Sequence, residues 1–136
     1  MLNKTIYIDK LAWIEVRDRK VLETRNFGKD TWYIPGGKRI EGETDEKALI
    51  REIREELSVD LIPETIEYYG TFEAPAHGKK EGVYVRMLCY TAEYKGTLKP
   101  GHEVEKMDWF LYEKKEMTSL VDHLIFDDLK KKDLID

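Results

Sequence analysis

The segment from Thr44 to Leu57 constrains the fold most, because it lacks proline and glycine and repeats apolar residues with the period of an α-helix. Thr44 is typical of an N-cap, and the two acidic residues after it suit the first turn of a helix. On a helical wheel, Glu52, Glu55 and Glu56 fall within an arc of about 100°. The sequence therefore predicts a helix that buries one side and presents three carboxylates along its edge.

Such a carboxylate cluster indicates a metal site. Three carboxylates this close repel one another, so keeping them ionised at neutral pH requires positive charge. Oxygen ligands in this number suit Mg²⁺ or Mn²⁺. A zinc site would require histidine or thiolate ligands, and the three histidines show no metal-site spacing. Ala48 falls among the acids on the same wheel, and we expect its small side chain to leave space there.

Length, composition and charge limit the class of protein. The chain has 136 residues, 41% of them hydrophobic, which predicts one domain spanning residues 1–136. No apolar run approaches the roughly 18 residues of a membrane span, and Cys89, the single cysteine, stands in an apolar run typical of a buried reduced thiol. We expect a soluble cytoplasmic protein with no membrane partner. The net charge of −5 argues against nonspecific nucleic-acid binding.

The remaining pattern predicts strands before, between and after two helices. The expected strands are 11–17, 20–25, 31–34, 67–74, 83–94 and 106–111, and the expected second helix is 119–134. The first two strands would form a hairpin across the polar break Asp18-Arg19, and Leu120, Leu124 and Ile125 would form the apolar stripe of the second helix. This order predicts an α/β or α+β layered domain with a mixed sheet covered by helices.

A spaced motif links the helix to the glycines before it. Its fixed residues are Gly37, Glu43, Arg51, Glu52, Ile53, Glu55, Glu56, Ser58 and Val59. The motif resembles the box of the Nudix hydrolases, written G-x5-E-x7-R-E-U-x-E-E-x-G-U with U aliphatic. The one departure is Ser58, which stands where the family usually has glycine at the end of the helix. Trp32, ahead of Pro35-Gly36-Gly37, extends the likeness upstream.

The resemblance implies a fold, an activity and a cofactor. The fold would be a Nudix-type α/β/α sandwich with a mixed β-sheet. The activity would be hydrolysis of a nucleoside diphosphate linked to another moiety, with water attacking a phosphorus of the pyrophosphate. The family likeness also implies Mg²⁺ or Mn²⁺ held by the carbonyl oxygen of Gly37 and by Glu52, Glu55 and Glu56. Glu43 and Arg51 would orient these ligands; a solvated acid and a surface ion pair are the simpler alternatives for the two.

The general base and the substrate contacts stay open at this stage. Glu52 is one candidate base, and Glu103, six residues before a tryptophan, is similar to a second position that the family uses; Glu105 is the fallback. For substrate binding we consider Trp32, Gly36 and His77, although core packing or a loop position explains the two side chains equally simply. Pro75 is similar to a marker of ADP-ribose hydrolysing members, but a simple turn accounts for it.

Two rival functions share the same fold. A non-catalytic nucleotide-binding regulatory module would be expected to lose carboxylates of the motif, whereas Glu52, Glu55 and Glu56 are all present. An isopentenyl diphosphate isomerase relies on a cysteine before the motif, and Cys89 comes after it. The expected partner is a small nucleotide-type diphosphate. The lysine clusters are too short to argue for RNA, and a homodimer is compatible with the resemblance.

Overall fold

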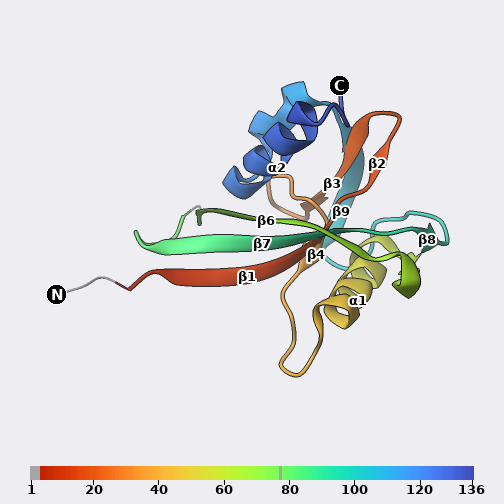
Figure 1. Ribbon diagram of the computed structural model, residues 1–136, viewed down its shortest axis with the longest axis horizontal. Coiled ribbons are helices and arrows are strands. Elements are labelled where there is room, and N and C mark those ends of the chain that lie inside the picture. The colour runs from red at the N-terminus through yellow and green to blue at the C-terminus, as the bar shows by residue number, and fades with distance from the viewer. Residues whose placement is uncertain (1–3, 77) are drawn as a thin grey trace.

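The computed structural model describes residues 4–76 and 78–136, and Figure 1 shows its arrangement. The elements are β1 (Ile6–Trp13), β2 (Val16–Arg17), β3 (Lys20–Asn26), β4 (Gly36–Gly37), α1 (Asp45–Leu57), β5 (Asp60–Leu61), the 3₁₀ helix η1 (Pro63–Thr65), β6 (Glu67–Pro75), β7 (Val83–Thr91), β8 (Tyr94–Lys95), β9 (Val104–Phe110), the 3₁₀ helix η2 (Tyr112–Met117) and α2 (Leu120–Lys131). None of the described helices is long and apolar enough to cross a membrane.

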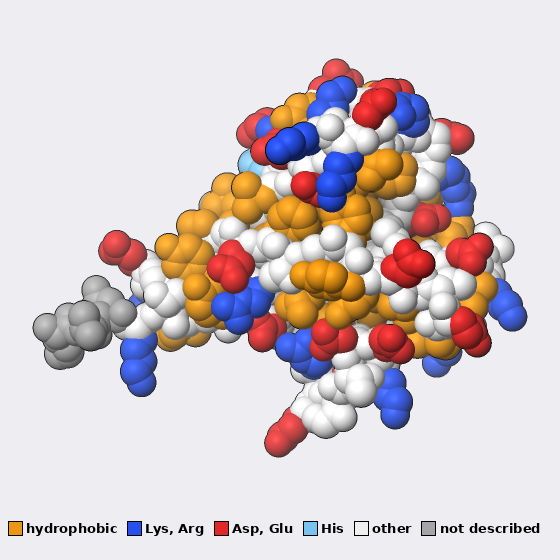
Figure 2. All heavy atoms as spheres, in the orientation of Figure 1, with side chains coloured by type: hydrophobic (Ala, Val, Ile, Leu, Met, Phe, Trp, Pro, Cys, Tyr) orange, Lys and Arg blue, Asp and Glu red, His pale blue; other side chains and the backbone are white. Residues whose placement is uncertain are grey.

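The strands form a mixed sheet between two helices. Four strands follow the order β4-β1-β7-β6, in which β1 and β7 are parallel and the other pairs are antiparallel. A second sheet has the order β2-β3-β9. In Figure 1, α1 and α2 lie on opposite sides of the strands. Figure 2 shows a band of hydrophobic side chains crossing the strands below α2, bordered by charged groups. The expected α/β sandwich is therefore confirmed.

The alternation of side chains along β1 divides the interior into two cores. Leu11 and Trp13 pack in the cluster that includes the buried side of α1, whereas Ala12 and Ile14 pack in the cluster that includes the buried side of α2. Successive side chains of a strand point to opposite faces, so one strand contributes to both layers. The short strand β4 pairs with the end of β1, at Leu11 and Ala12. This pairing brings the two glycines of β4 beside α1.

The N-cap of α1 is the predicted Thr44, and Ser58 at the other end adopts the conformation that glycine usually takes there. The Thr44 side chain accepts a hydrogen bond from the Lys47 N–H at 3.2 Å. At the other end, Ser58 has φ 64° and ψ 22°, the left-handed conformation in which glycine is usual, and its N–H donates to the Arg54 carbonyl. The Ser58 hydroxyl also donates to the Lys99 carbonyl at 3.1 Å. Serine therefore keeps the cap geometry of the motif.

Three strand predictions need correction. The expected strand 31–34 is absent, because Trp32 and Tyr33 make only isolated bridges and the paired residues are Gly36–Gly37. The expected strand 11–17 is interrupted after Trp13, because β1 begins at Ile6 and pairs with β7. The predicted hairpin across Asp18-Arg19 is confirmed, and it joins β2 to β3. The strand predicted at 83–94 ends at Thr91.

Two predictions about helix faces were also wrong. Leu120 and Leu124 are 42% and 41% exposed, and the buried stripe of α2 is formed by Val121, Ile125, Phe126 and Leu129. Ala48 is fully buried and packs in the core with Leu49 and Ile53, so it belongs to the buried side of α1. A wheel gives relative angles, and small differences in helix rotation decide which side chains face the sheet. The prediction that Cys89 is buried is confirmed.

We predict that the α1 core supplies much of the stability on which the carboxylate edge depends. Ile53 is fully buried, so Ile53→Ala should lower the free energy of unfolding by about 2–5 kcal/mol through lost contacts and a cavity. Ile40, 57% exposed, is the matched control, and Ile40→Ala should stay within about 0.5 kcal/mol. Urea unfolding followed by circular dichroism measures both. Equal losses would contradict this account of the core.

Candidate active site

Two glycines allow β4 to approach its neighbours more closely than any other residue would. A Cβ on Gly36, which has φ 151°, would lie 1.8 Å from the Leu11 carbonyl oxygen. A Cβ on Gly37 would lie 2.4 Å from the carboxyl carbon of Glu52. Real Cβ atoms do not occur at such distances. Gly36 therefore cannot be replaced without moving the backbone of β1, and a side chain at Gly37 would displace the Glu52 carboxylate. The Pro35-Gly36-Gly37 sequence therefore makes room for a carboxylate as well as a turn.

Glu56 is the most deeply placed carboxylate of the motif. Glu56 is only 6% exposed, and its Oε1 accepts a hydrogen bond from the Gly36 N–H at 2.8 Å. Burial raises the pKa of Glu56 to about 8; the Gly36 hydrogen bond opposes this rise, and the nearby charges of Glu52 and Glu103 add to it. Ionised Glu56 therefore requires a cation beside it at neutral pH.

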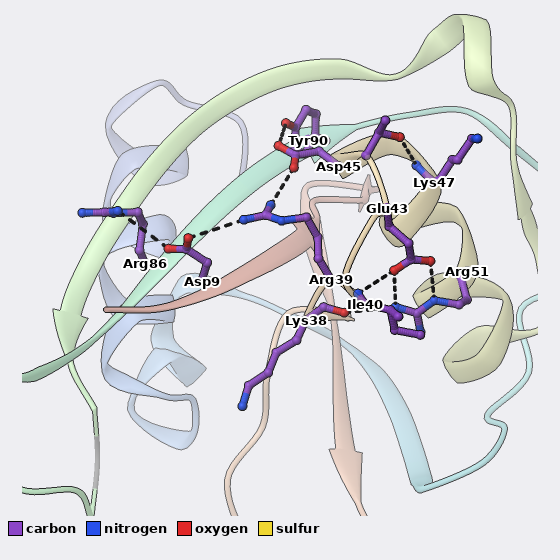
Figure 3. A network of polar contacts seen from close by, with 11 residues as sticks. Asp9, Lys38, Arg39, Ile40, Glu43, Asp45, Lys47, Arg51, Arg86 and Tyr90 are labelled. Carbon is purple, nitrogen blue, oxygen red and sulfur yellow. Dashed lines mark hydrogen bonds and ion pairs between the residues drawn. The ribbon is translucent and has the colours of Figure 1, made fainter. Parts of the chain in front are cut away.

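Arg51 of α1 binds Glu43, which precedes the helix in the motif, as the network in Figure 3 shows. Its Nε and Nη2 donate to the two carboxylate oxygens of Glu43 at 2.8 and 2.9 Å, and its Nη1 donates to Glu52 at 2.9 Å. Nη2 also donates to the Lys38 carbonyl at 3.0 Å. The Arg51 hydrogen bonds, with one from the Ile40 N–H, lower the pKa of Glu43 to about 2. Glu43 and Arg51 thus hold the loop after β4 against α1.

The carboxylates surround a hollow of about 490 Å³ at the end of β4. Glu52, Glu56 and Glu103 line it, together with the cations Lys10, Lys29 and Lys38. Glu55 lies outside this lining, and its side chain is 42% exposed and 3.6 Å from Arg51. In Figure 3 the Lys38 ammonium extends away from the ion-pair network. One hollow therefore offers carboxylates for a cation and ammonium groups for phosphate oxygens.

The carboxylates are held apart by their own partners. Glu52 is bonded to Arg51 and Glu56 to the Gly36 N–H. Across residues 4–76 and 78–136, no three His, Cys, Asp or Glu side chains converge as a metal site. The donor set nevertheless fits a hard divalent cation, since it consists of oxygens and includes a buried carboxyl group whose charged form lacks compensation. Small side-chain rotations would be needed to bring these oxygens onto one ion.

Other predicted residues lie elsewhere. Trp32 is 8% exposed and packs in the α2 core, with its ring centroid 4.9 Å from that of Phe110. Glu105 does not line the hollow and forms an ion pair with Arg25 at 2.9 Å. His77 lies outside the described residues. Of the candidate bases, Glu52 and Glu103 reach the hollow.

Sequence reasoning missed a buried acidic pair behind the site. Asp122 of α2 and Glu23 of β3 are fully buried, and Asp122 Oδ2 accepts a hydrogen bond from the Ile34 N–H at 2.8 Å. Burial raises the pKa of Asp122 to about 7 and that of Glu23 well above its usual value, so the pair is not doubly ionised at neutral pH. The alternation of β3 gave a weak signal, because Glu23 occupies an inward-facing position between Val21 and Arg25.

Lys10 was also missed. It stands in a strand of otherwise mostly apolar and aromatic residues, lines the hollow and is about 5.8 Å from the centre of the Tyr33 ring. Burial lowers its pKa, and so does the nearby charge of Lys38. A lone cation on the inward face of a strand was the signal that could have revealed it.

Comparisons with known proteins agree on one family. A family model described as NUDIX domain matches residues 11–125. An RNA pyrophosphohydrolase of Shewanella sediminis is 31% identical over 114 residues, which are 80% of this chain and 60% of that protein. The chain therefore spans about three fifths of that relative.

Solved structures give the same fold. The solution structure of the E. coli ORF135 protein is 26% identical, with a TM-score of 0.71 over 93% of this chain and 92% of that one. The crystal structure of a MutT NUDIX hydrolase from Burkholderia pseudomallei, 20% identical, has a TM-score of 0.74 over 89% of this chain and 96% of that one.

We predict that the charge of Glu56 makes the metal-free protein less stable as pH rises. Its pKa is raised from 4.5 to about 8, so the native state holds a proton that the unfolded state releases. Protonated Glu56 therefore contributes fully to the free energy of unfolding below the pKa of the carboxyl group in the unfolded chain. This contribution is lost as pH rises through the pKa of Glu56 in the folded protein. With EDTA present, wild type should therefore lose stability relative to Glu56→Gln between about pH 5 and about pH 8.

Thermal or urea unfolding across this pH range measures the difference. Mg²⁺ or Mn²⁺ should stabilise wild type at the upper end of the range and leave Glu56→Gln nearly unchanged, because the amide carries no charge. Glu46→Gln, an exposed substitution on the same helix, is the control. A pH-independent difference and equal metal effects in all three proteins would contradict the role given to Glu56.

Proposed function

The chain belongs to the Nudix family, and we propose that it is a metal-dependent pyrophosphohydrolase acting on a small nucleotide-type diphosphate. The observation that carries the proposal is the hollow lined by three lysines and three glutamates, of which Glu56 is buried, Glu52 half-buried and Glu103 exposed. A site for a non-catalytic regulatory module would not need a carboxyl group buried at such cost. The buried thiol of Cys89 is compatible with a cytoplasmic location.

The proposed cation is Mg²⁺ or Mn²⁺, held by Glu52, Glu55, Glu56 and the carbonyl oxygen of Gly37. When bound, such an ion neutralises the diphosphate and lowers the pKa of the attacking water. Glu55 must turn inward to take part, and its exposed side chain has the freedom to do so. Arg51 and Glu43 keep Glu52 and the loop after β4 in position.

In the proposed reaction, the lysines bind the non-bridging phosphate oxygens and a general base removes a proton from water. The water oxygen forms a bond to phosphorus, the bridging P–O bond breaks, and the departing phosphate keeps the bonding electrons. Among the three candidate bases, we favour Glu103, because it lines the hollow while Glu52 is bonded to Arg51 and Glu105 is paired with Arg25. No ion pair involves Glu103 among the described residues.

A second candidate substrate is the 5′ end of RNA, which the 31% identity to an RNA pyrophosphohydrolase favours. The net charge of −5 argues for the smaller substrate, since strong RNA binding relies on many phosphate contacts. A homodimer stays a prediction from the family resemblance. Both substrate classes can be tested in one assay.

We predict turnover that requires both metal and Glu56. The assay follows phosphate or nucleotide release from nucleoside triphosphates, ADP-ribose, nucleotide sugars, dinucleoside polyphosphates and a triphosphorylated RNA, each with Mg²⁺, Mn²⁺ or EDTA. EDTA should abolish turnover, and Glu56→Gln should lower kcat/KM by about two orders of magnitude or more, whereas Glu46→Gln should not. Binding without turnover on the whole panel would favour the regulatory module.

We also predict that substituting Glu103 and Glu105 separately identifies the general base. Glu103→Gln should lower kcat by about 10²–10⁴-fold with little change in KM, because the amide cannot accept the proton of the attacking water. Glu105→Gln, two residues later at the start of β9, is the matched control and should retain near-normal turnover. If Glu103→Gln keeps its rate, the base is Glu52 instead.

A further inference from the structure

A second, smaller hollow adjoins the candidate active site. Its volume is about 210 Å³, and it shares Lys10, Tyr33 and Met87 with the larger hollow. The end of β6, the loop after it and the first turn of α2 form most of the remaining wall, and Ile8 of β1 and Val85 of β7 complete it. A substrate bound through its diphosphate at the larger hollow can therefore extend a second group past Lys10.

The charge of this second hollow differs from that of the first. Lys10 and Lys79 line it, and none of its described lining residues is aspartate or glutamate. Lys10 is half-buried and has no carboxylate oxygen within 4.0 Å among the described residues. Behind it lie Asp122 and Glu56, whose charges act on Lys10 only from a distance. A half-buried ammonium group without a close counter-ion gains most from binding an anion.

The α2 side of the hollow adds polar groups that suit an anion. Ser119, the N-cap of α2, lines it, and its Oγ makes no cap hydrogen bond and lies beside the Asp122 carboxyl group. The N–H groups in the first turn of a helix lack intrahelical acceptors and favour negative charge. The remaining wall is apolar and includes Ile8, Val85 and Leu120. The hollow can thus hold an apolar ring and an anionic substituent together.

We propose that this hollow, the Lys10–Lys79 chamber, binds a second phosphate ester on the substrate. The enzyme would then prefer diphosphates whose attached moiety carries a phosphate of its own. The inference rests on the proposed function, because the diphosphate must occupy the neighbouring site. The second phosphate can be a monoester on a small nucleotide or the first internucleotide phosphodiester of an RNA 5′ end, and the two share the chemistry that the lysines recognise.

Matched substrate pairs test the chamber. ADP-ribose is compared with ADP-ribose 2′-phosphate, and ATP with the triphosphorylated dinucleotide pppApA. For wild type, the added phosphate should lower KM by about tenfold or more in at least one pair, as a charge-assisted hydrogen bond would. Lys79→Gln should reduce that advantage to about threefold or less. Lys80→Gln, an exposed neighbour that does not line the chamber, should retain it.

Dissociation constants for the same pairs, measured by calorimetry without metal, separate this proposal from the proposed function. A phosphate advantage in binding, combined with no turnover of any substrate when Mg²⁺ or Mn²⁺ is present, would leave the chamber standing and remove the hydrolase proposal. If only ADP-ribose 2′-phosphate binds more tightly than its partner, the chamber binds a phosphate monoester. If only pppApA does so, the chamber binds the phosphodiester of an RNA 5′ end. Equal affinities within both pairs, or equal losses in Lys79→Gln and Lys80→Gln, would overturn the chamber.

Discussion

The close contact between a glycine strand and a buried carboxyl group is the constraint on which the site depends. The Gly36 N–H donates to Glu56 at 2.8 Å, and no side chain could be added to Gly36 without meeting the Leu11 carbonyl. Gly37 leaves the space that the Glu52 carboxylate fills. Because β4 lies this close to both β1 and α1, two carboxylates of one helix edge border a single hollow.

The strand segment that carries these glycines is held from three directions. Asp122 of α2 accepts from Ile34 at 2.8 Å, the Trp13 N–H of β1 donates to the Pro35 carbonyl at 2.9 Å, and Glu56 of α1 accepts from Gly36. Each layer of the sandwich thus contributes one hydrogen bond to three consecutive residues. The position of the carboxylates is therefore a property of both layers, although the motif itself lies on one.

Separated charges explain how an acidic protein can bind a polyanion. The carboxylates of the hollow come from α1 and from the loop before β9. The lysines come from β1, from the loop after β3 and from the residue after β4. The acids alone would repel a diphosphate, and the lysines alone would not position a cation. Lys10 belongs to both hollows, so it is the natural link between the diphosphate and any further anionic group.

The sequence by itself determined the features that depend on near neighbours along the chain. The helix from Thr44 to Leu57, its caps and the spacing of its carboxylates follow from helical periodicity and capping, which act within a few residues. Tertiary structure decided the rest. The pairing of Gly36–Gly37 with β1 and the contact of Asp122 with Ile34 join distant segments, and local pattern carries no information about which distant segments meet. The burial of Ala48 was decided in the same way, because a wheel orders side chains by angle and only packing against the sheet chooses the arc that is covered.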